Sequence, residues 1–205
     1  MLLRDFYRNV YRLEGEQLIS ELEAVSGLRM VRRGEVVLRE GETQKDALLL
    51  IEGVFRGYFF DEEGREVTEC FAYEIGSPVM SRAEMGTPSN IAIAALADSL
   101  CAVLPVAELL RLIAAYPELS EVYRGLLRDS TRYHWNAKAA VYKYSARERV
   151  EWFRKTFPGL MELAGGKYVA SFLNMTPVTL SRIRSEAREE QSSPENQGAP
   201  RREKE

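Results

Sequence analysis

The segment KYVASFLNMTPVTLSRIRSE, residues 167–186, constrains the fold more than any other part of the chain. It has the parts of two short helices that cross at a tight turn: a small contact residue, apolar residues at inward-facing spacings, and a turn residue. Ala170 is the small contact residue, and Asn174 suits the left-handed backbone of the turn. The apolar positions that we expect to face inward are Val169, Leu173, Met175, Leu180 and Ile183.

A start signal for the second helix follows the turn. Thr176 supplies an N-cap hydroxyl and Pro177 suits a first helical turn. Two interpretations are open: an ordinary helical hairpin in a larger core, or a helix-turn-helix whose second helix reads DNA. The outward face favours DNA, because short hydroxyls beside arginines suit a DNA groove. The candidate DNA-binding residues are Lys167, Thr176, Pro177, Val178, Thr179, Ser181, Arg182, Arg184 and Ser185, with Arg188 further along the helix.

Charge is unevenly divided along the chain. The net charge of −3 is unusual for a nucleic-acid-binding protein. Residues 1–137 carry 15 Lys and Arg against 22 Asp and Glu, a net −7, whereas residues 138–188 carry 10 against 4, a net +6. The positive charge is therefore concentrated where the hairpin lies, as expected of a nucleic-acid-binding segment.

The composition limits the class of protein. A chain of 205 residues with 45% hydrophobic content is globular, with one or two domains. It has no apolar run of membrane-spanning length, and its first residues carry charges where a signal peptide needs an apolar centre, so we expect a cytoplasmic protein with no membrane partner. We find no P-loop, G-x-S-x-G or H-E-x-x-H motif and therefore expect no catalytic residues and no enzyme activity.

Cysteine and histidine are too few for a zinc site or a cysteine-ligated cluster, and we expect no metal and no cofactor. Cys70 and Cys101 lie in apolar runs and are interpreted as small buried hydrophobic residues. The single histidine, His134, has two interpretations, a haem ligand or a packed or surface residue. The second is favoured, because the sequence offers no paired ligand.

Between residues 29 and 104 short apolar runs alternate with turn residues, which predicts a small all-β sandwich or barrel. The stretch Asp61–Gly64 predicts a hairpin loop. The run IAIAALADSLCAVLP predicts two strands with Ala97–Ser99 as the turn. A helix is expected before this region, from Leu3 to about Leu22.

A long helix is predicted from Pro117 to about Tyr144. Its spacing of four and three residues marks a stripe of Leu119, Tyr123, Leu126, Ser130, Tyr133, Ala137, Ala140 and Tyr144. The stripe is typical of a dimer helix, and the alternative is a helix packed on its own β domain. A further helix is expected from Ala146 to Thr156, ending at Phe157-Pro158-Gly159.

This order of elements resembles the Crp/Fnr family of bacterial transcription regulators over about residues 5–186. The matching motifs are RRGEVVLREGE, LLLIEGVFRGYFFDEEGREVT and TPVTLSRIRSE. The resemblance implies an α+β fold with four parts. These are a cyclic-nucleotide-binding-like β-roll sensory domain at residues 1–116, a dimerisation helix at 117–144, a helix-turn-helix DNA-binding domain at 145–188 and a tail at 189–205. The tail lacks apolar residues, and we expect it to be disordered.

The resemblance also implies partners and roles. Its partners would be double-stranded DNA, a second copy of the chain and RNA polymerase, with an unknown small-molecule effector. By position, Arg182 matches the family's base-reading arginine, and Thr179 and Ser181 match neighbouring DNA-contacting positions. Val178 stands where an acidic residue is common, so the operator is expected to differ, with a thymine methyl as a contact. The β-hairpin wing that usually follows is missing.

The effector site departs from the family's phosphate clamp, a Gly-Glu pair and an Arg-Ser pair. Gly76 is followed by Ser77, and Pro88-Ser89-Asn90 replaces the Arg-Ser pair, while Arg82 lies before the expected position. We therefore expect cyclic AMP to bind poorly. Two alternatives stay open: a ligand-binding or protein-interaction module that has lost DNA reading, and a regulator that is active with a collapsed pocket.

Overall fold

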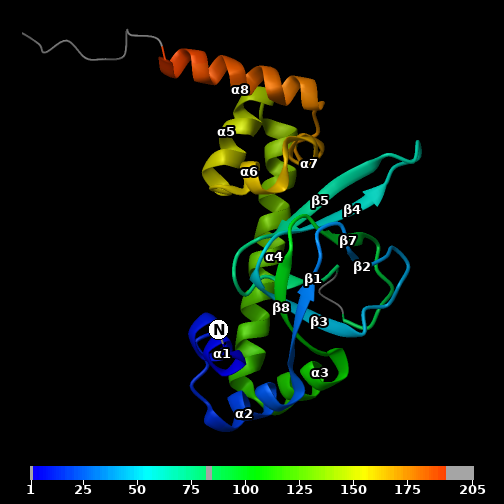
Figure 1. The fold of residues 1–205 in the computed structure, drawn as a ribbon, viewed down its shortest axis with the longest axis vertical. Helices are drawn as coiled ribbons and strands as arrows, with labels where there is room; N and C mark the ends of the chain where they lie inside the picture. The colour runs from blue at the N-terminus through cyan, green and yellow to red at the C-terminus, as the bar shows by residue number, and fades with distance from the viewer. Residues whose placement is uncertain (1, 82–84, 193–205) are drawn as a thin grey trace, which may run out of the picture.

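The computed structural model describes residues 2–81 and 85–192 (Figure 1). Its helices are α1 (Leu3–Val10), α2 (Glu16–Val25), α3 (Val106–Ala115), α4 (Pro117–Lys143), α5 (Ala146–Thr156), α6 (Leu160–Ala164), α7 (Gly166–Phe172) and α8 (Pro177–Ser192). Its strands are β1 (Gly27–Val31), β2 (Val36–Leu38), β3 (Asp46–Glu52), β4 (Phe55–Phe60), β5 (Glu66–Ala72), β6 (Pro78–Val79), β7 (Ala92–Ala95) and β8 (Ser99–Pro105).

Two four-stranded antiparallel sheets form the β-roll. Their strand orders are β1-β8-β3-β6 and β2-β7-β4-β5. The two sheets enclose an apolar core. It consists of Val31, Leu38, Leu48, Leu50, Phe55, Val79, Ile91, Ile93, Ala95 and Cys101. The α+β class and the order of β-roll, long helix and C-terminal helices are confirmed.

Local turn chemistry sets the boundaries of the central strands. Gly53 joins β3 to β4 with φ of 116°, and a Cβ there would lie 2.1 Å from the Ser99 hydroxyl, so this position requires glycine. The predicted loop at Asp61–Gly64 joins β4 to β5, and the Asp61 carboxylate accepts hydrogen bonds from the backbone N–H groups of Glu63 and Arg65. The predicted pair of strands after residue 90 is also present, with Ser99 beginning β8 rather than ending the turn.

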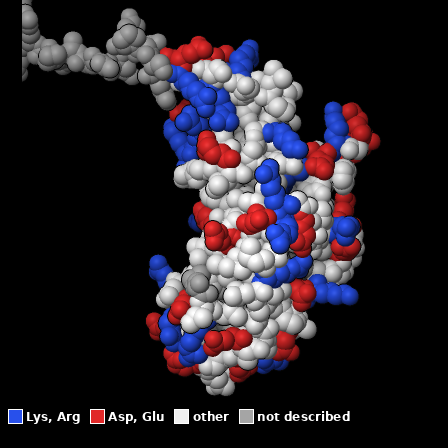
Figure 2. All heavy atoms as spheres, in the orientation of Figure 1, with Lys and Arg blue, Asp and Glu red and all other residues white. Residues whose placement is uncertain are grey.

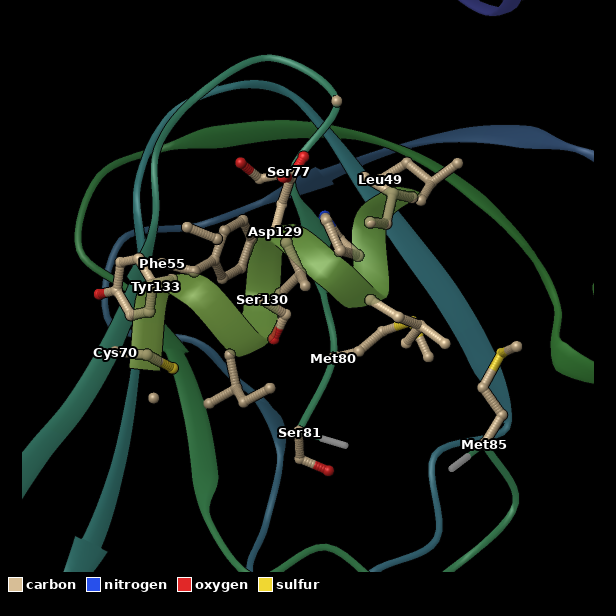
Figure 3. Close-up of a pocket in the computed structure, with 18 of the residues that line it drawn as sticks. Leu49, Phe55, Cys70, Ser77, Met80, Ser81, Met85, Asp129, Ser130 and Tyr133 are labelled. Carbon is tan, nitrogen blue, oxygen red and sulfur yellow. The ribbon is translucent and has the colours of Figure 1, made fainter. Parts of the chain in front are cut away.

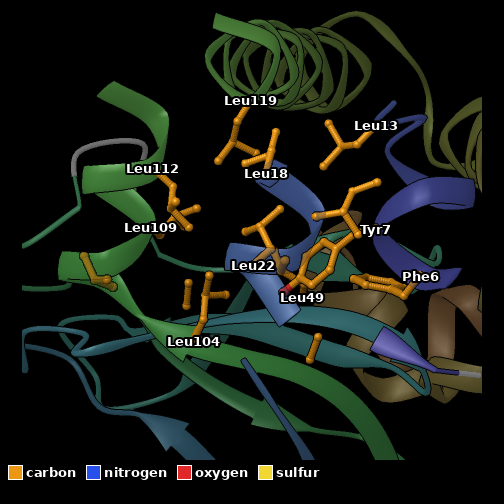
Figure 4. Packing of buried hydrophobic residues seen from close by; sticks show 14 residues of the cluster. Phe6, Tyr7, Leu13, Leu18, Leu22, Leu49, Leu104, Leu109, Leu112 and Leu119 are labelled. Carbon is orange, nitrogen blue, oxygen red and sulfur yellow. The ribbon is translucent and has the colours of Figure 1, made fainter. Parts of the chain in front are cut away.

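The N-terminal segment forms two helices rather than the single helix expected over residues 3–22. The backbone reverses between α1 and α2, where Arg12 has a φ of 56°. The carboxylate of Glu118, on α4, accepts hydrogen bonds from the N–H groups of Glu14 and Gly15 at 2.5 and 3.2 Å, which satisfies the backbone of this break. Figure 4 shows the resulting apolar packing of α1, α2, α3 and the start of α4.

The long helix α4 runs past one side of the β-roll to the C-terminal helices (Figure 1). The stripe that the sequence marks for a dimer contacts its own chain over most of its length: Leu119 and Ala140 are buried, and Tyr123, Leu126, Ser130 and Tyr133 face a cavity beside the β-roll. Part of this stripe therefore packs on the chain's own β-roll, as the alternative interpretation expects, and the contact with a second copy stays a prediction. Large apolar side chains of another face are exposed, with Trp135 at 69% and Tyr142 at 80%.

The C-terminal helices α5 to α8 share an aromatic core that includes Phe153, Phe157 and Phe172. Helix α5 begins at Ala146, because Ser145 and Glu148 form a reciprocal capping box. Helix α8 continues to Ser192, so the expected boundary at residue 188 is wrong by four residues. The rest of the expected disordered tail, from residue 193, lies outside the described residues.

Candidate DNA-reading helix and effector pocket

The turn between α7 and α8 has the predicted geometry. Asn174 is in the left-handed region with φ of 51°. The Thr176 hydroxyl accepts a hydrogen bond from the N–H of Thr179 at 3.1 Å, so Thr176 caps α8, which begins at Pro177. Val169, Ala170, Leu173, Leu180 and Ile183 are buried and Met175 packs against them, as predicted.

The outward face of α8 presents its side chains to the surface. Val178 is 78% exposed, and the Arg182 side chain is 73% exposed with its Nε 3.8 Å from Glu186. Ser181 and Ser185 are also exposed. An exposed pair at that distance is weak, so the guanidinium can exchange Glu186 for another acceptor.

Other candidate DNA-binding residues are differently engaged. Arg184 turns toward its own chain, with Nη2 3.7 Å from Glu162 on α6 and a side chain only 29% exposed. The Thr179 hydroxyl lies 2.9 Å from that of Thr176. Lys167 is exposed, and its Nζ stands 4.5 Å from the centroid of the Tyr168 ring. Among these residues, Arg182 projects outward with only a weak, exposed ion pair.

Lys and Arg side chains gather around the helical end of the molecule. Figure 2 shows them over α5 and along the underside of α8, whereas acidic and basic residues alternate over the β-roll and the N-terminal helices. Residues 138–188, which carry the net charge of +6, include all of α5, α6 and α7 and most of α8. The sequence count thus corresponds to a basic region on the face shown in Figure 2.

Helix α7 is attached directly to the β4–β5 hairpin. Arg56 on β4 is 3% exposed, and its guanidinium stacks on the ring of Tyr168 from α7, 4.2 Å from the centroid. Its Nη1 also pairs with Glu66 at 2.6 Å. On β5, the N–H of Thr68 donates to the Ser171 hydroxyl at 2.9 Å. This attachment could not be predicted from the sequence, since it joins segments more than 100 residues apart.

A cavity of about 1090 Å³ lies between the β-roll and α4. Figure 3 shows Ser130 and Tyr133 of α4 facing Phe55, Cys70, Ser77 and Met80 of the β-roll. The Tyr133 hydroxyl accepts a hydrogen bond from the N–H of Phe71 at 3.1 Å, which fixes this part of α4 on β5. The same tyrosine ring contacts Phe157 and Phe172 of the C-terminal aromatic core.

The expected effector residues are only partly brought together. Gly76, Ser77 and Asn90 line the cavity. Ser89 does not: it is 4% exposed, and its hydroxyl donates to the carbonyl of Ile91 at 2.5 Å, so it closes a local turn. Arg82 lies outside the described residues.

The single histidine has an acidic partner that the sequence did not predict. His134 Nδ1 lies 2.8 Å from Glu69 Oε1 at the edge of the cavity. This hydrogen bond raises the pKa of His134, against the effect of burial. Burial opposes ionisation of Glu69, but hydrogen bonds from His134 and Cys70 outweigh it and lower the carboxyl pKa. His134 is therefore a partly exposed surface residue with a carboxylate partner.

The pocket cysteine is not poised for thiolate chemistry. Burial, reinforced by the Glu69 carboxylate, raises the pKa of the Cys70 thiol well above its ordinary value. Burial also raises the pKa of the Cys101 thiol, to about 11. Both cysteines thus serve as small core residues, although Cys70 also borders the cavity.

Solved structures that share this fold include bacterial regulators. The structure of FixK2 from Bradyrhizobium japonicum superposes with a TM-score of 0.73 at 18% identity, covering 82% of this chain and 86% of that one. The c-di-GMP-responsive global regulator CLP of Xanthomonas campestris gives a TM-score of 0.68 at 12% identity, covering 86% and 93%. A putative transcriptional regulator of the Crp/Fnr family from Eubacterium rectale gives 0.70 at 14% identity, covering 91% and 88%.

The chain therefore has the fold of the Crp/Fnr regulators. In sequence, no protein-family model and no curated protein matches it. Within the described residues, none of the helices combines the length and apolar character needed to cross a bilayer.

Proposed function

We propose that this protein is a sequence-specific DNA-binding transcription regulator of the Crp/Fnr type that is not controlled by cyclic AMP. The observation that carries the proposal is the exposed face of α8, where Arg182 and short hydroxyl residues project outward while Leu180 and Ile183 are buried. A helix held in this way offers one fixed set of side chains to the edges of base pairs. The shared fold with bacterial regulators supports the same conclusion.

Two exposed residues of α8 and one of α7 have specific roles in the proposed complex. Arg182 makes a bidentate contact with a guanine in the major groove, because its planar guanidinium matches two acceptors on that base. Val178 meets a thymine methyl group, since an exposed isopropyl group has no hydrogen bond to offer. Lys167, at the start of α7, contacts the phosphate backbone and contributes affinity without sequence preference.

The proposed regulator acts as a homodimer, which places two recognition helices in successive major grooves. A stripe of exposed residues of α4, which begins at the half-buried Leu127, is the surface that we assign to the second copy. Its members recur every four, four, three and four residues, and they are Leu127, Thr131, Trp135, Lys138 and Tyr142. Two large exposed aromatic side chains on one helix face are typical of an interface.

The test begins by selecting genomic duplex fragments that bind the purified full-length protein without added ligand. Affinity for a selected fragment and for random duplex is then measured by fluorescence anisotropy at several salt concentrations. We expect Arg182→Ala to remove the preference for the selected fragment, a loss of about 1–3 kcal/mol, while sedimentation shows the same dimer. Residual affinity for random duplex persists through the other cations.

Arg39→Ala is the matched control, because it removes one exposed arginine from the β-roll, far from α8. The Arg39→Ala protein should discriminate between the selected fragment and random duplex as well as the unaltered protein does. An Arg182→Ala protein that discriminates as well as this control would exclude Arg182 from base reading. If no duplex is bound even at low salt, the chain is instead a ligand-binding or protein-interaction module whose helix-turn-helix does not bind DNA.

A further inference from the structure

The cavity between the β-roll and α4 is bordered mainly by apolar side chains. Those contributed by the β-roll include Leu49, Phe55, Phe71, Val79, Met80 and Met85, and α4 adds Leu126 and Tyr133. We propose that this cavity binds an uncharged, largely apolar small molecule. The inference deepens the proposed function, because this molecule would be the regulator's effector.

Charge on the cavity wall opposes an anionic ligand. Carboxylates of Glu40, Glu69, Glu74 and Asp129 border the cavity, whereas none of the described lining residues is Lys or Arg. Glu69 is paired with His134 and Asp129 with Arg132, at 2.8 and 2.7 Å, so these pairs are already neutralised. Among the described lining residues, a phosphate would meet the remaining carboxylates and no guanidinium or ammonium group to bind it.

The nearest buried arginine faces the other way. Side chains alternate along β4, so Phe55, Gly57 and Phe59 face the cavity while Arg56 and Tyr58 point to the opposite side of the sheet. Arg56 is held there by Glu66, Thr68 and the stacked Tyr168 ring. A rotamer change cannot bring this guanidinium into the cavity, because the strand backbone lies between them.

A few polar groups on the cavity wall can orient a ligand that is otherwise apolar. The side chains of Ser77 and Ser130 lie on opposite walls, one from the β-roll and one from α4 (Figure 3). Hydroxyl groups at such positions can bond a single carbonyl or hydroxyl of the ligand. Met80 and Met85 are flexible and polarisable, so they adapt to the shape of an apolar occupant.

Two fluorescent probes with the same aromatic skeleton separate charge from apolar character. N-phenyl-1-naphthylamine is uncharged, and 1-anilinonaphthalene-8-sulfonate adds one sulfonate. Each is titrated into the full-length protein, and cyclic AMP is added as a competitor. We expect the uncharged probe to bind with increased emission, the sulfonated probe to bind about tenfold more weakly or worse, and cyclic AMP to displace neither.

Ser130→Phe tests whether the probe lies in this cavity, because the new ring projects into it from an exposed position on α4. It should weaken binding of the uncharged probe about tenfold or more. Asn136→Phe is the matched control, since it places the same ring at an exposed position of α4 that does not border the cavity. Ser130→Leu adds a smaller obstruction, and thermal unfolding checks that all three variants fold.

Two results would overturn the proposal. In the first, the sulfonated probe or cyclic AMP binds as tightly as the uncharged probe, and its binding depends on Ser130 in the same way. In the second, neither Ser130 variant changes the binding of the uncharged probe. DNA discrimination is measured separately, without probe. A protein that selects duplex but excludes the uncharged probe disproves the pocket chemistry alone, and one that binds the probe but no duplex disproves the DNA-reading function alone.

Discussion

The C-terminal helices and the β-roll stabilise themselves in different ways. The helical end is small and basic, and its aromatic rings fill its interior, with Phe153 4.9 Å from Phe157 and 5.6 Å from Phe172 between ring centroids. The β-roll is larger and acidic, and a cavity of about 1090 Å³ lies between it and α4. The difference teaches that the two regions suit the two proposed roles: the packed helices would present a rigid surface to DNA, and the cavity would admit a small molecule.

Truncating one side chain in each region tests this contrast most strongly. Phe153→Ala should lower the free energy of unfolding by about 3–5 kcal/mol, because it leaves a new void among packed rings. Met80→Ala should cost less than about 1 kcal/mol, because its atoms border the cavity and have fewer contacts to lose. Urea denaturation of both variants measures the difference, and equal losses would break the contrast.

The junction of the two regions gives a smaller expected effect. A double-mutant cycle of Arg56→Met and Tyr168→Leu should show a coupling of about 1 kcal/mol, because the guanidinium is buried over the ring. The same cycle with Lys167→Met in place of Arg56→Met is the control. Its ammonium lies 4.5 Å from the same ring but is exposed, so the coupling should be near zero. Equal couplings would show that burial does not matter here.

The smallest expected effect is a pH dependence of stability that arises from His134 and Glu69 at the edge of the cavity. The raised pKa of His134 means that its stabilising effect is complete below the ordinary value of 6.5 and is lost as pH rises through the folded-state pKa. The lowered pKa of Glu69 means that its effect is present above 4.5 and is lost as pH falls through its folded-state pKa.

His134→Gln should therefore destabilise the protein most between about pH 4.5 and 6.5, by less than about 1 kcal/mol because both groups are partly exposed. Unfolding by urea across the pH range measures the difference from the unaltered protein. Asn136→Gln, on the same helix, should give a difference that is independent of pH. A loss of stability in His134→Gln that is greatest above pH 8 would contradict the assignment.

The C-terminal helices were predictable because their signals are local. Thr176 and Pro177 mark the start of α8 from adjacent positions, and Asn174 adopts its left-handed turn two residues earlier. Burial of Leu180 and Ile183 follows from helical spacing alone. Such features depend on a few neighbouring residues, so a single sequence is enough to find them.

The cavity was harder to predict, since distant segments form it. Glu69 and His134 belong to β5 and α4, and Arg56 meets Tyr168 from α7, pairs that no spacing rule connects. The stripe along α4 illustrates the limit: periodicity identifies a face that will be buried but does not identify what covers it. Tyr133 therefore faces its own β-roll, where a contact with a second copy was expected.

The attachment of α7 to the β4–β5 hairpin has a geometric consequence. A rigid body joined to another by one flexible linker can rotate about that linker, and here the linker would be the chain between α4 and α5 at Tyr144 and Ser145. The Thr68–Ser171 hydrogen bond and the Arg56–Tyr168 stack supply a second anchor. With both anchors in place, the tilt of α8 relative to the long helix is a fixed angle, and changing it requires breaking contacts at β4 and β5.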